Sequence, residues 1–170
     1  SLRRQRQMCI RDRIIAVLMQ VVKPVNWIDG LSRLTQAMDS SDLNEAEAAL
    51  STFAKISEDM PEELDACEIQ GMRPLDVLIP KLLHATAHAD ARIRVHALNS
   101  LNQFIQIGSP SMSANMDAYV AVLFQRATDE RPIVRKFVCK ALVYVLSTWP
   151  EKLAPDMNSV VCLLYTSPSP

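Results

Sequence analysis

The stretch DERPIVRKFVCKALVYVL, residues 129–146, decides the fold of this chain. It opens with two acids and Pro132, and apolar residues then recur in steps of three and four positions. These are Val134, Val138, Ala141, Leu142, Val145 and Leu146. Such spacing places them on one side of an α-helix. Proline is tolerated in the first turn, because a backbone N–H there has no helical partner. We therefore predict an amphipathic helix that begins near Pro132.

The same layout occurs once more, earlier in the chain. Asp90 precedes Ile93-Arg94, and a stripe of apolar residues follows at Ala97, Leu101, Phe104 and Ile105. Arg94 and Arg135 are 41 positions apart, within the ~40–47 residue period of a HEAT or armadillo unit. The spacing predicts an all-α fold, a right-handed α-solenoid of HEAT repeats.

We expect about three full helical hairpins, near residues 25–60, 74–107 and 116–149, in an array spanning residues 14–162. Partial helices are expected at 14–22 and 152–162. Asn26 is the expected N-cap of its helix, and Gly108 the expected C-terminal stop. The segment Pro61–Arg73 is predicted to be an exposed loop, and residues 109–115 a polar link. Because each hairpin is apolar on both flanks, neighbouring hairpins must stack.

The composition fits this interpretation. Hydrophobic residues make up 49% of the 170 residues, aromatic residues only 5%, and there are three glycines, which suits helices. The net charge of −1 argues against a nucleic-acid binder. No run of ~18 uncharged apolar residues occurs, so we expect no membrane span. The four cysteines form no C-x-x-C pair, and we expect them to be buried reduced thiols.

Both ends are interpreted as non-native. Residues 1–13, SLRRQRQMCIRDR, form a basic leader, and residues 163–170, LLYTSPSP, form a Pro/Ser tail. Each resembles the translation of a sequencing adapter, so we expect the natural protein to continue past both ends. The alternative for the leader is a genuine basic arm that touches a membrane or nucleic acid.

The sequence offers little for catalysis. His84 and His88 have the i, i+4 spacing of a zinc pair, but Ala85 replaces the glutamate of the metalloprotease motif and no third ligand is evident. Three glycines cannot build a phosphate-binding loop. We expect no catalytic residue, no cofactor and no metal. A metal-dependent enzyme that uses the two histidines is the alternative from a different functional class.

Basic residues cluster near the beginning of the second helix in each of the two predicted hairpins at 74–107 and 116–149. One interpretation is a basic patch for an acidic partner. The other, which we favour, is a structural ladder in which Arg94 and Arg135 approach the turn acids Asp90, Asp129 and Glu130. Such pairs would tie neighbouring units together. The basic residues are Arg92, Arg94, Arg131, Arg135, Lys136 and Lys140.

Acids cluster around the helix predicted near residues 43–59. Asp42, Glu45 and Glu47 suit its positive N-terminal end, whereas Glu58 and Asp59 lie at the C-terminal end, where negative charge is unfavourable. This placement indicates either a basic partner or a merely solvated helix end.

Three stretches go beyond a generic HEAT pattern: Asn26-Trp27, RPLDVLIPKLLHATAHADARIRVHALNSLNQFI (Arg73–Ile105) and the stretch at Asp129–Leu146. In sequence and order they resemble the transportins, nuclear import receptors of the karyopherin-beta family. The resemblance covers roughly residues 14–161. It is weaker in the segments Pro61–Arg73 and Ile107–Met116.

The resemblance implies a fragment of the N-terminal HEAT-repeat arch of such a receptor. Transportins grip the GTP-bound form of the GTPase Ran on this arch, and Ran is basic on the faces that import receptors contact. Glu47, Glu58 and Asp59 would then be Ran-binding residues. Cargo with a proline-tyrosine nuclear localisation signal would bind the missing C-terminal arch.

The same resemblance implies nucleoporins as further partners, no nucleic acid or membrane, and shuttling between cytoplasm and nucleus. The protein would act by protein–protein binding and would not be an enzyme. Another type of HEAT scaffold, a phosphatase regulatory subunit or a coat adaptor, is the alternative with the same fold.

Overall fold

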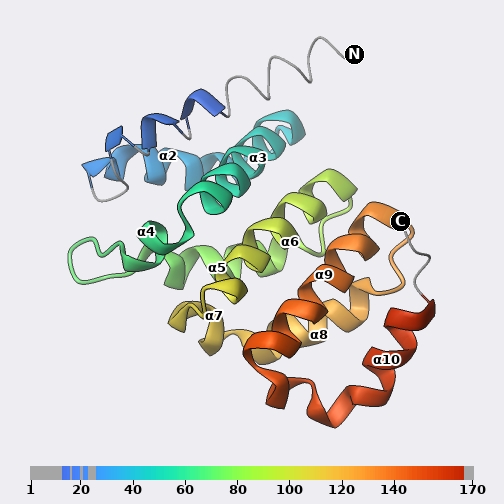
Figure 1. The fold of residues 1–170 in the computed structure, drawn as a ribbon. Coiled ribbons are helices and arrows are strands. Elements are labelled where there is room, and N and C mark those ends of the chain that lie inside the picture. Colours follow the sequence, from blue (N-terminus) through green and yellow to red (C-terminus); the bar gives the residue numbers. More distant parts are fainter. Residues whose placement is uncertain (1–12, 16, 20, 23–25, 167–170) are drawn as a thin grey trace. The chain divides into compact units, whose positions relative to one another are not determined.

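The computed structural model describes residues 13–15, 17–19, 21–22 and 26–166 (Figure 1). In those ranges the chain forms helices and turns and contains no strand. One isolated antiparallel bridge pairs Ile69 with Met72. The predicted all-α helical-repeat architecture is confirmed, while its superhelical hand stays a prediction. Residues 1–12 of the leader and 167–170 of the tail lie outside the described residues.

The first of two compact units spans residues 1–78. Its helices are α2 (Ile28–Ala37), α3 (Leu43–Asp59), α4 (Pro61–Ala66) and the beginning of α5 (Pro74–Ala85). α2 and α3 form a hairpin, and the described positions between 13 and 22 are helical. Phe53 and Ile56 of α3 are fully buried. The α2–α3 hairpin thus has its core on the apolar stripe of α3.

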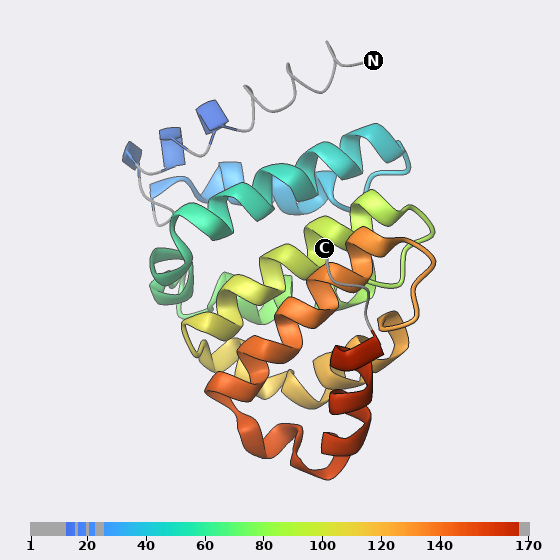
Figure 2. The ribbon, with the colours of Figure 1, turned by 45° about the vertical axis from the view of Figure 1, so that its right-hand side comes forward.

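The second unit spans residues 79–170 and contains the end of α5 and the remaining helices. These are α6 (Ala91–Gln106), α7 (Pro110–Ala114), α8 (Met116–Arg126), α9 (Pro132–Thr148), the 3-10 turns η2 (Pro150–Lys152) and η3 (Ala154–Asp156), and α10 (Met157–Thr166). α6 and α9 lie side by side, which both views show (Figures 1 and 2). The apolar stripe of α9 is buried as predicted at Val134, Val138, Ala141, Leu142 and Val145.

The start of α2 differs from the expectation. The helix begins at Ile28 with Trp27 before it, and no side chain caps its N-terminus. Asn26 instead donates a hydrogen bond backwards, from Nδ2 to the carbonyl of Val22 at 3.0 Å. A Cβ atom at Gly30 would overlap the indole of Trp27. The packing of this ring on Gly30 therefore accompanies a helix start that the N-cap rule did not predict.

The segment Pro61–Arg73 is more structured than the exposed loop that we predicted. It begins with α4 and ends in a tight turn at Gln70-Gly71, where both residues have positive φ values (52° and 77°). Leu64 and Cys67 are buried. Burial of these side chains offsets the conformational entropy that the segment loses on becoming ordered, because each fully buried apolar side chain stabilises the fold by about 1.5–3 kcal/mol.

The predicted polar link at 109–115 also contains a helix, α7, with Met112 fully buried. Gly108 ends α6 as predicted: its φ of 68° allows the Ser109 N–H to reach the Phe104 carbonyl at 3.0 Å. The cysteine prediction was partly wrong. Cys67, Cys139 and Cys162 are reduced, but Cys139 is partly exposed and Cys162 is exposed. No helix in the described ranges is long and apolar enough to cross a membrane.

Candidate functional site

The turns that precede the three second helices α3, α6 and α9 use the same hydrogen bond. In each, a side chain accepts the backbone N–H of the residue two positions further on. The pairs are Ser40 Oγ with Asp42 at 3.2 Å, His88 Nδ1 with Asp90 at 2.9 Å, and Asp129 Oδ1 with Arg131 at 3.0 Å. Each accepting residue lies two positions before the N-cap of its helix, so the three turns are structurally equivalent.

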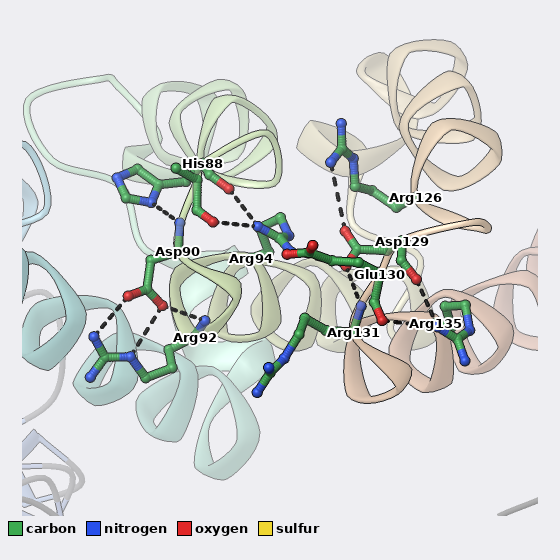
Figure 3. Close-up of polar contacts among 10 residues, drawn as sticks. His88, Asp90, Arg92, Arg94, Arg126, Asp129, Glu130, Arg131 and Arg135 are labelled. Atoms are coloured by element: carbon green, nitrogen blue, oxygen red, sulfur yellow. Dashed lines mark hydrogen bonds and ion pairs between the residues drawn. The ribbon is translucent and has the colours of Figure 1, made fainter.

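Arg94 crosses from α6 to the turn before α9 (Figure 3). Its Nη2 is 2.9 Å from Asp129 Oδ1, and the two side chains are only 5% and 2% exposed. Its Nη1 donates to the carbonyls of His88 and Ala89 at 2.9 and 2.7 Å. One guanidinium thus holds two successive turns in a fixed register.

Arg135 repeats half of this arrangement. Its Nη1 donates to the carbonyls of Asp129 and Glu130 at 2.7 and 3.4 Å, the same sequence offsets that Arg94 uses. Asp90 pairs with Arg92, with Nη2 at 2.8 Å from Oδ2. Of the four predicted ladder residues, the structure therefore brings Arg94 and Asp129 together. Arg135 reaches the backbone carbonyl of Asp129, and Asp90 pairs instead with Arg92.

The electrostatics of the turns follow from these contacts. Burial of the Asp129 carboxyl would raise its pKa, but the N–H of Arg131 and the guanidinium of Arg94 outweigh burial and hold the pKa below its ordinary value. The side-chain hydrogen bond from Arg92 lowers the pKa of Asp90 to about 2. Nε of Arg94 is buried without a hydrogen-bond partner, so a further desolvation cost falls on this pair.

The acids at the end of α3 have an intramolecular partner that the sequence reasoning missed. Lys55 Nζ lies 3.1 Å from Glu58 Oε2 and 2.9 Å from Asp59 Oδ1. The hydrogen bond with Asp59 raises the pKa of Lys55. Both acids are exposed, whereas Glu47 is half-buried. The i, i+3 and i, i+4 spacing from Lys55 was the available signal.

A buried hydrogen-bonded cluster also joins three helices of the second unit. Tyr119 of α8 donates to Asn102 Oδ1 of α6 at 2.8 Å, and Asn102 Nδ2 donates to the Phe137 carbonyl of α9 at 3.2 Å. Tyr119 and Asn102 are fully buried, and burial raises the pKa of the Tyr119 hydroxyl. The cluster fixes the position of α8 against the α6–α9 pair.

Among the described residues, His84 and His88 belong to no group of metal ligands. Nδ1 of His88 accepts the Asp90 N–H, and the described residues contain no group of three or more His, Cys, Asp or Glu side chains able to hold a metal ion. The position of His88 corresponds to that of Asp129, 41 residues further on. That correspondence was the sequence signal for its role in the turn.

Comparison with known proteins gives two kinds of match. A protein-family model described as "Dynein axonemal assembly factor 5-like, TPR repeats" matches residues 65–155. The α6 and α9 helices begin 41 residues apart, which is longer than the ~34 residues of a TPR unit and within the HEAT range.

Among individual proteins, the chain is similar to the Importin subunit beta-2 of Schizosaccharomyces pombe, with 40% identity over 142 residues, 83% of this chain. It is 39% identical to Transportin-1 of Mus musculus over 136 residues, 80% of the chain. It is 41% identical to Transportin-1 of Homo sapiens over 121 residues, 71% of the chain. The chain spans 16%, 15% and 13% of the length of these relatives.

Proposed function

Because the chain belongs to the transportin (importin subunit beta-2) family and to the helical-repeat family matched over residues 65–155, we propose that its parent protein is a nuclear import receptor. The receptor binds other proteins and catalyses no reaction. The observation that carries this proposal is the 40% identity over 142 residues to an importin subunit. The all-α repeat architecture supports it, since stacked hairpins present long surfaces to protein partners.

In this proposal the segment lies in the N-terminal arch and contributes to the binding of Ran-GTP. Cargo with a proline-tyrosine nuclear localisation signal binds the C-terminal arch, outside this chain, and nucleoporins bind the receptor during its passage between cytoplasm and nucleus. Ran-GTP and cargo weaken each other's binding. Linkage requires that antagonism to be reciprocal.

The acids of α3 are the proposed contact with Ran. Glu58 and Asp59 are exposed, and Glu47 is 11 residues before Glu58, which places Glu47 and Glu58 on nearly the same side of the helix. Lys55 already bridges Glu58 and Asp59. A lysine or arginine of Ran therefore has to compete with Lys55 for these carboxylates. Only the interaction free energy in excess of the internal ion pair contributes to affinity.

The test is binding of the full-length receptor to Ran loaded with GTP or with GDP. The double variant Glu58→Lys/Asp59→Lys should bind Ran-GTP about tenfold more weakly, since each exposed pair is worth up to about 1 kcal/mol. Glu62→Lys/Glu63→Lys is the matched control, because it changes the net charge equally on exposed residues of α4. Lys55→Ala, which frees the two acids, should strengthen binding slightly.

Unchanged affinity in the Glu58→Lys/Asp59→Lys receptor would remove these acids from the Ran surface. A full-length receptor that binds Ran in neither nucleotide state would overturn the larger proposal. That result would favour a HEAT scaffold of another type, a phosphatase regulatory subunit or a coat adaptor.

A further inference from the structure

The second helices of the second unit carry positive charge only. α6 and α9 contain no Asp or Glu. Arg135 donates to the carbonyls of the turn before α9, which accounts for its place near the beginning of the helix. Lys136 and Lys140 make no such contact within the described residues, so their charges are available to a partner. The cations within the helices are Arg92, Arg94, Arg135, Lys136 and Lys140.

Two of these cations are exposed and have no carboxylate partner within the described part of the chain. Lys136 and Lys140 are separated by one helical turn, a rise of about 6 Å, and no ion pair to either is formed. Lys140 Nζ lies 5.5 Å from the centroid of the Tyr144 ring. Arg131, just before α9, is exposed and extends away from the turn, which only its backbone N–H joins (Figure 3).

Apolar groups lie among these cations. Ile133 is 45% exposed, and Phe137 and Tyr144 are half-buried. Ile133, Lys136, Lys140 and Tyr144 follow one another in steps of three and four, so they share one side of α9. It lies opposite the buried stripe that contains Val138 and Ala141. We call this the α9 basic surface, defined by Arg131, Ile133, Lys136, Lys140 and Tyr144.

We propose that the α9 basic surface binds an acidic segment of a partner protein, in which Asp or Glu residues recur at every second position. In an extended segment, alternate side chains are about 6.6 Å apart, close to the rise from Lys136 to Lys140. Two carboxylates at alternate positions lie on the same face of such a segment and can thus pair with the two ammonium groups. The site uses a different helix from the acids of α3, and its ligand has the opposite charge.

A nucleic-acid ligand fits the surface less well. The chain as a whole has a net charge of −1, whereas phosphate binding rewards a marked excess of cations. Single strands also need exposed aromatic rings on which bases stack, and the rings of Phe137 and Tyr144 are half-buried.

The experiment is a fluorescence-anisotropy titration of this chain with a labelled peptide that repeats Glu-Leu-Glu-Phe. Lys136→Glu/Lys140→Glu should weaken binding about tenfold, because two exposed pairs become repulsive. Lys81→Glu/Lys152→Glu is the control for net charge: it changes the charge of the same unit equally, on α5 and η2, and should leave binding within about twofold, although it also breaks the ion pair of Lys152 with Asp117. Circular dichroism checks that both variants stay folded.

The controls on the ligand side decide the chemistry. The same peptide with Gln in place of Glu should lose most of its binding, and the loss on adding salt should be larger for the wild type than for Lys136→Glu/Lys140→Glu. Equal weakening by the two double variants, equal binding of the Gln peptide, or binding of an oligothymidine in preference to the acidic peptide would each overturn the proposal.

Discussion

The helix α3 of the first unit and the helices α6 and α9 of the second unit follow turns of the same type, but they carry net charges of opposite sign. Four residues after the N-cap, α3 has Ala46, whereas α6 and α9 have Arg94 and Arg135. α3 carries Glu45, Glu47, Glu58 and Asp59 against Lys55, a net charge of −3. α6 has two arginines and no acid, net +2, and α9 has Arg135, Lys136 and Lys140, net +3, with His taken as neutral.

The difference shows that the repeat constrains hydrogen bonding more than it constrains residue type. Ser40, His88 and Asp129 all accept the N–H of the residue two positions on, because the turn needs only an acceptor at that place. The exposed sides of the helices are free of this requirement. They can diverge in charge, and that divergence separates the candidate surfaces of α3 and α9.

The largest expected effect comes from breaking the core that the α6–α9 pair shares. Leu142→Asp places a carboxylate at a fully buried position and should lower the free energy of unfolding by about 4 kcal/mol or more. Val143→Asp is the matched control, because Val143 is 50% exposed. Thermal unfolding followed by circular dichroism measures both, and similar melting temperatures would contradict the assignment of the core.

The next largest effect concerns the contribution of the buried Arg94–Asp129 ion pair to stability. Asp129→Ala leaves a buried guanidinium without its carboxylate and should cost about 3–5 kcal/mol. Glu130→Ala, whose side chain is 81% exposed, should cost little. Arg94→Met together with Asp129→Ala removes the unpaired charge and should recover part of the loss. Urea unfolding of the three variants tests this, and a double variant less stable than Asp129→Ala would contradict it.

A smaller effect concerns the buried cluster between α6 and α8. Tyr119→Phe keeps the ring but leaves Asn102 Oδ1 without its 2.8 Å donor, which should cost about 1–3 kcal/mol. Because the ring still fills its space, no cavity adds to this figure. A Tyr119→Phe protein as stable as the wild type would show that water replaces the hydroxyl.

The smallest effect is a pH dependence at the beginning of α6. Asp90 has a pKa of about 2 in the folded chain, below the ordinary carboxyl value of about 3.9. Its contribution to stability is therefore fully present above about pH 4 and is lost as the pH falls through about 2. Asp90→Asn should flatten the loss of stability between these values, as acid titrations of the melting temperature would show. An equally steep loss would assign it to other carboxyls, Asp129 first.

The sequence predicted the parts of the fold that strong periodicity governs. The stripes of α6 and α9 and the glycine stop at Gly108 needed only local rules. The contact between Arg94 and Asp129 was predictable from the 41-residue spacing of the two repeats. The sequence could not predict α4 and α7, because helices of six and five residues show too few turns for a period and depend on burial of Leu64 and Met112.

The binding residues were less predictable for a related reason. A turn acceptor such as His88 has no preferred residue type, so only its 41-residue spacing from Asp129 marks it in the sequence. Lys55 lies at a recognisable spacing from Glu58 and Asp59. A single sequence contains many such spacings between opposite charges, however, and the spacing alone does not show which of them form ion pairs. Asn26 failed as a predicted N-cap because α2 begins one residue later, with Trp27 at the N-cap position and its ring against Gly30. The N-cap rule takes no account of this local contact.

The most direct test measures both ligands against variants of both surfaces, the acids of α3 and the α9 basic surface, in the full-length receptor. Ran-GTP and the labelled Glu-Leu-Glu-Phe peptide are each titrated against Glu58→Lys/Asp59→Lys and against Lys136→Glu/Lys140→Glu. We predict that the first variant loses affinity about tenfold for Ran-GTP alone, and the second for the acidic peptide alone. Equal losses for both ligands in either variant, or no loss in any combination, would contradict this prediction.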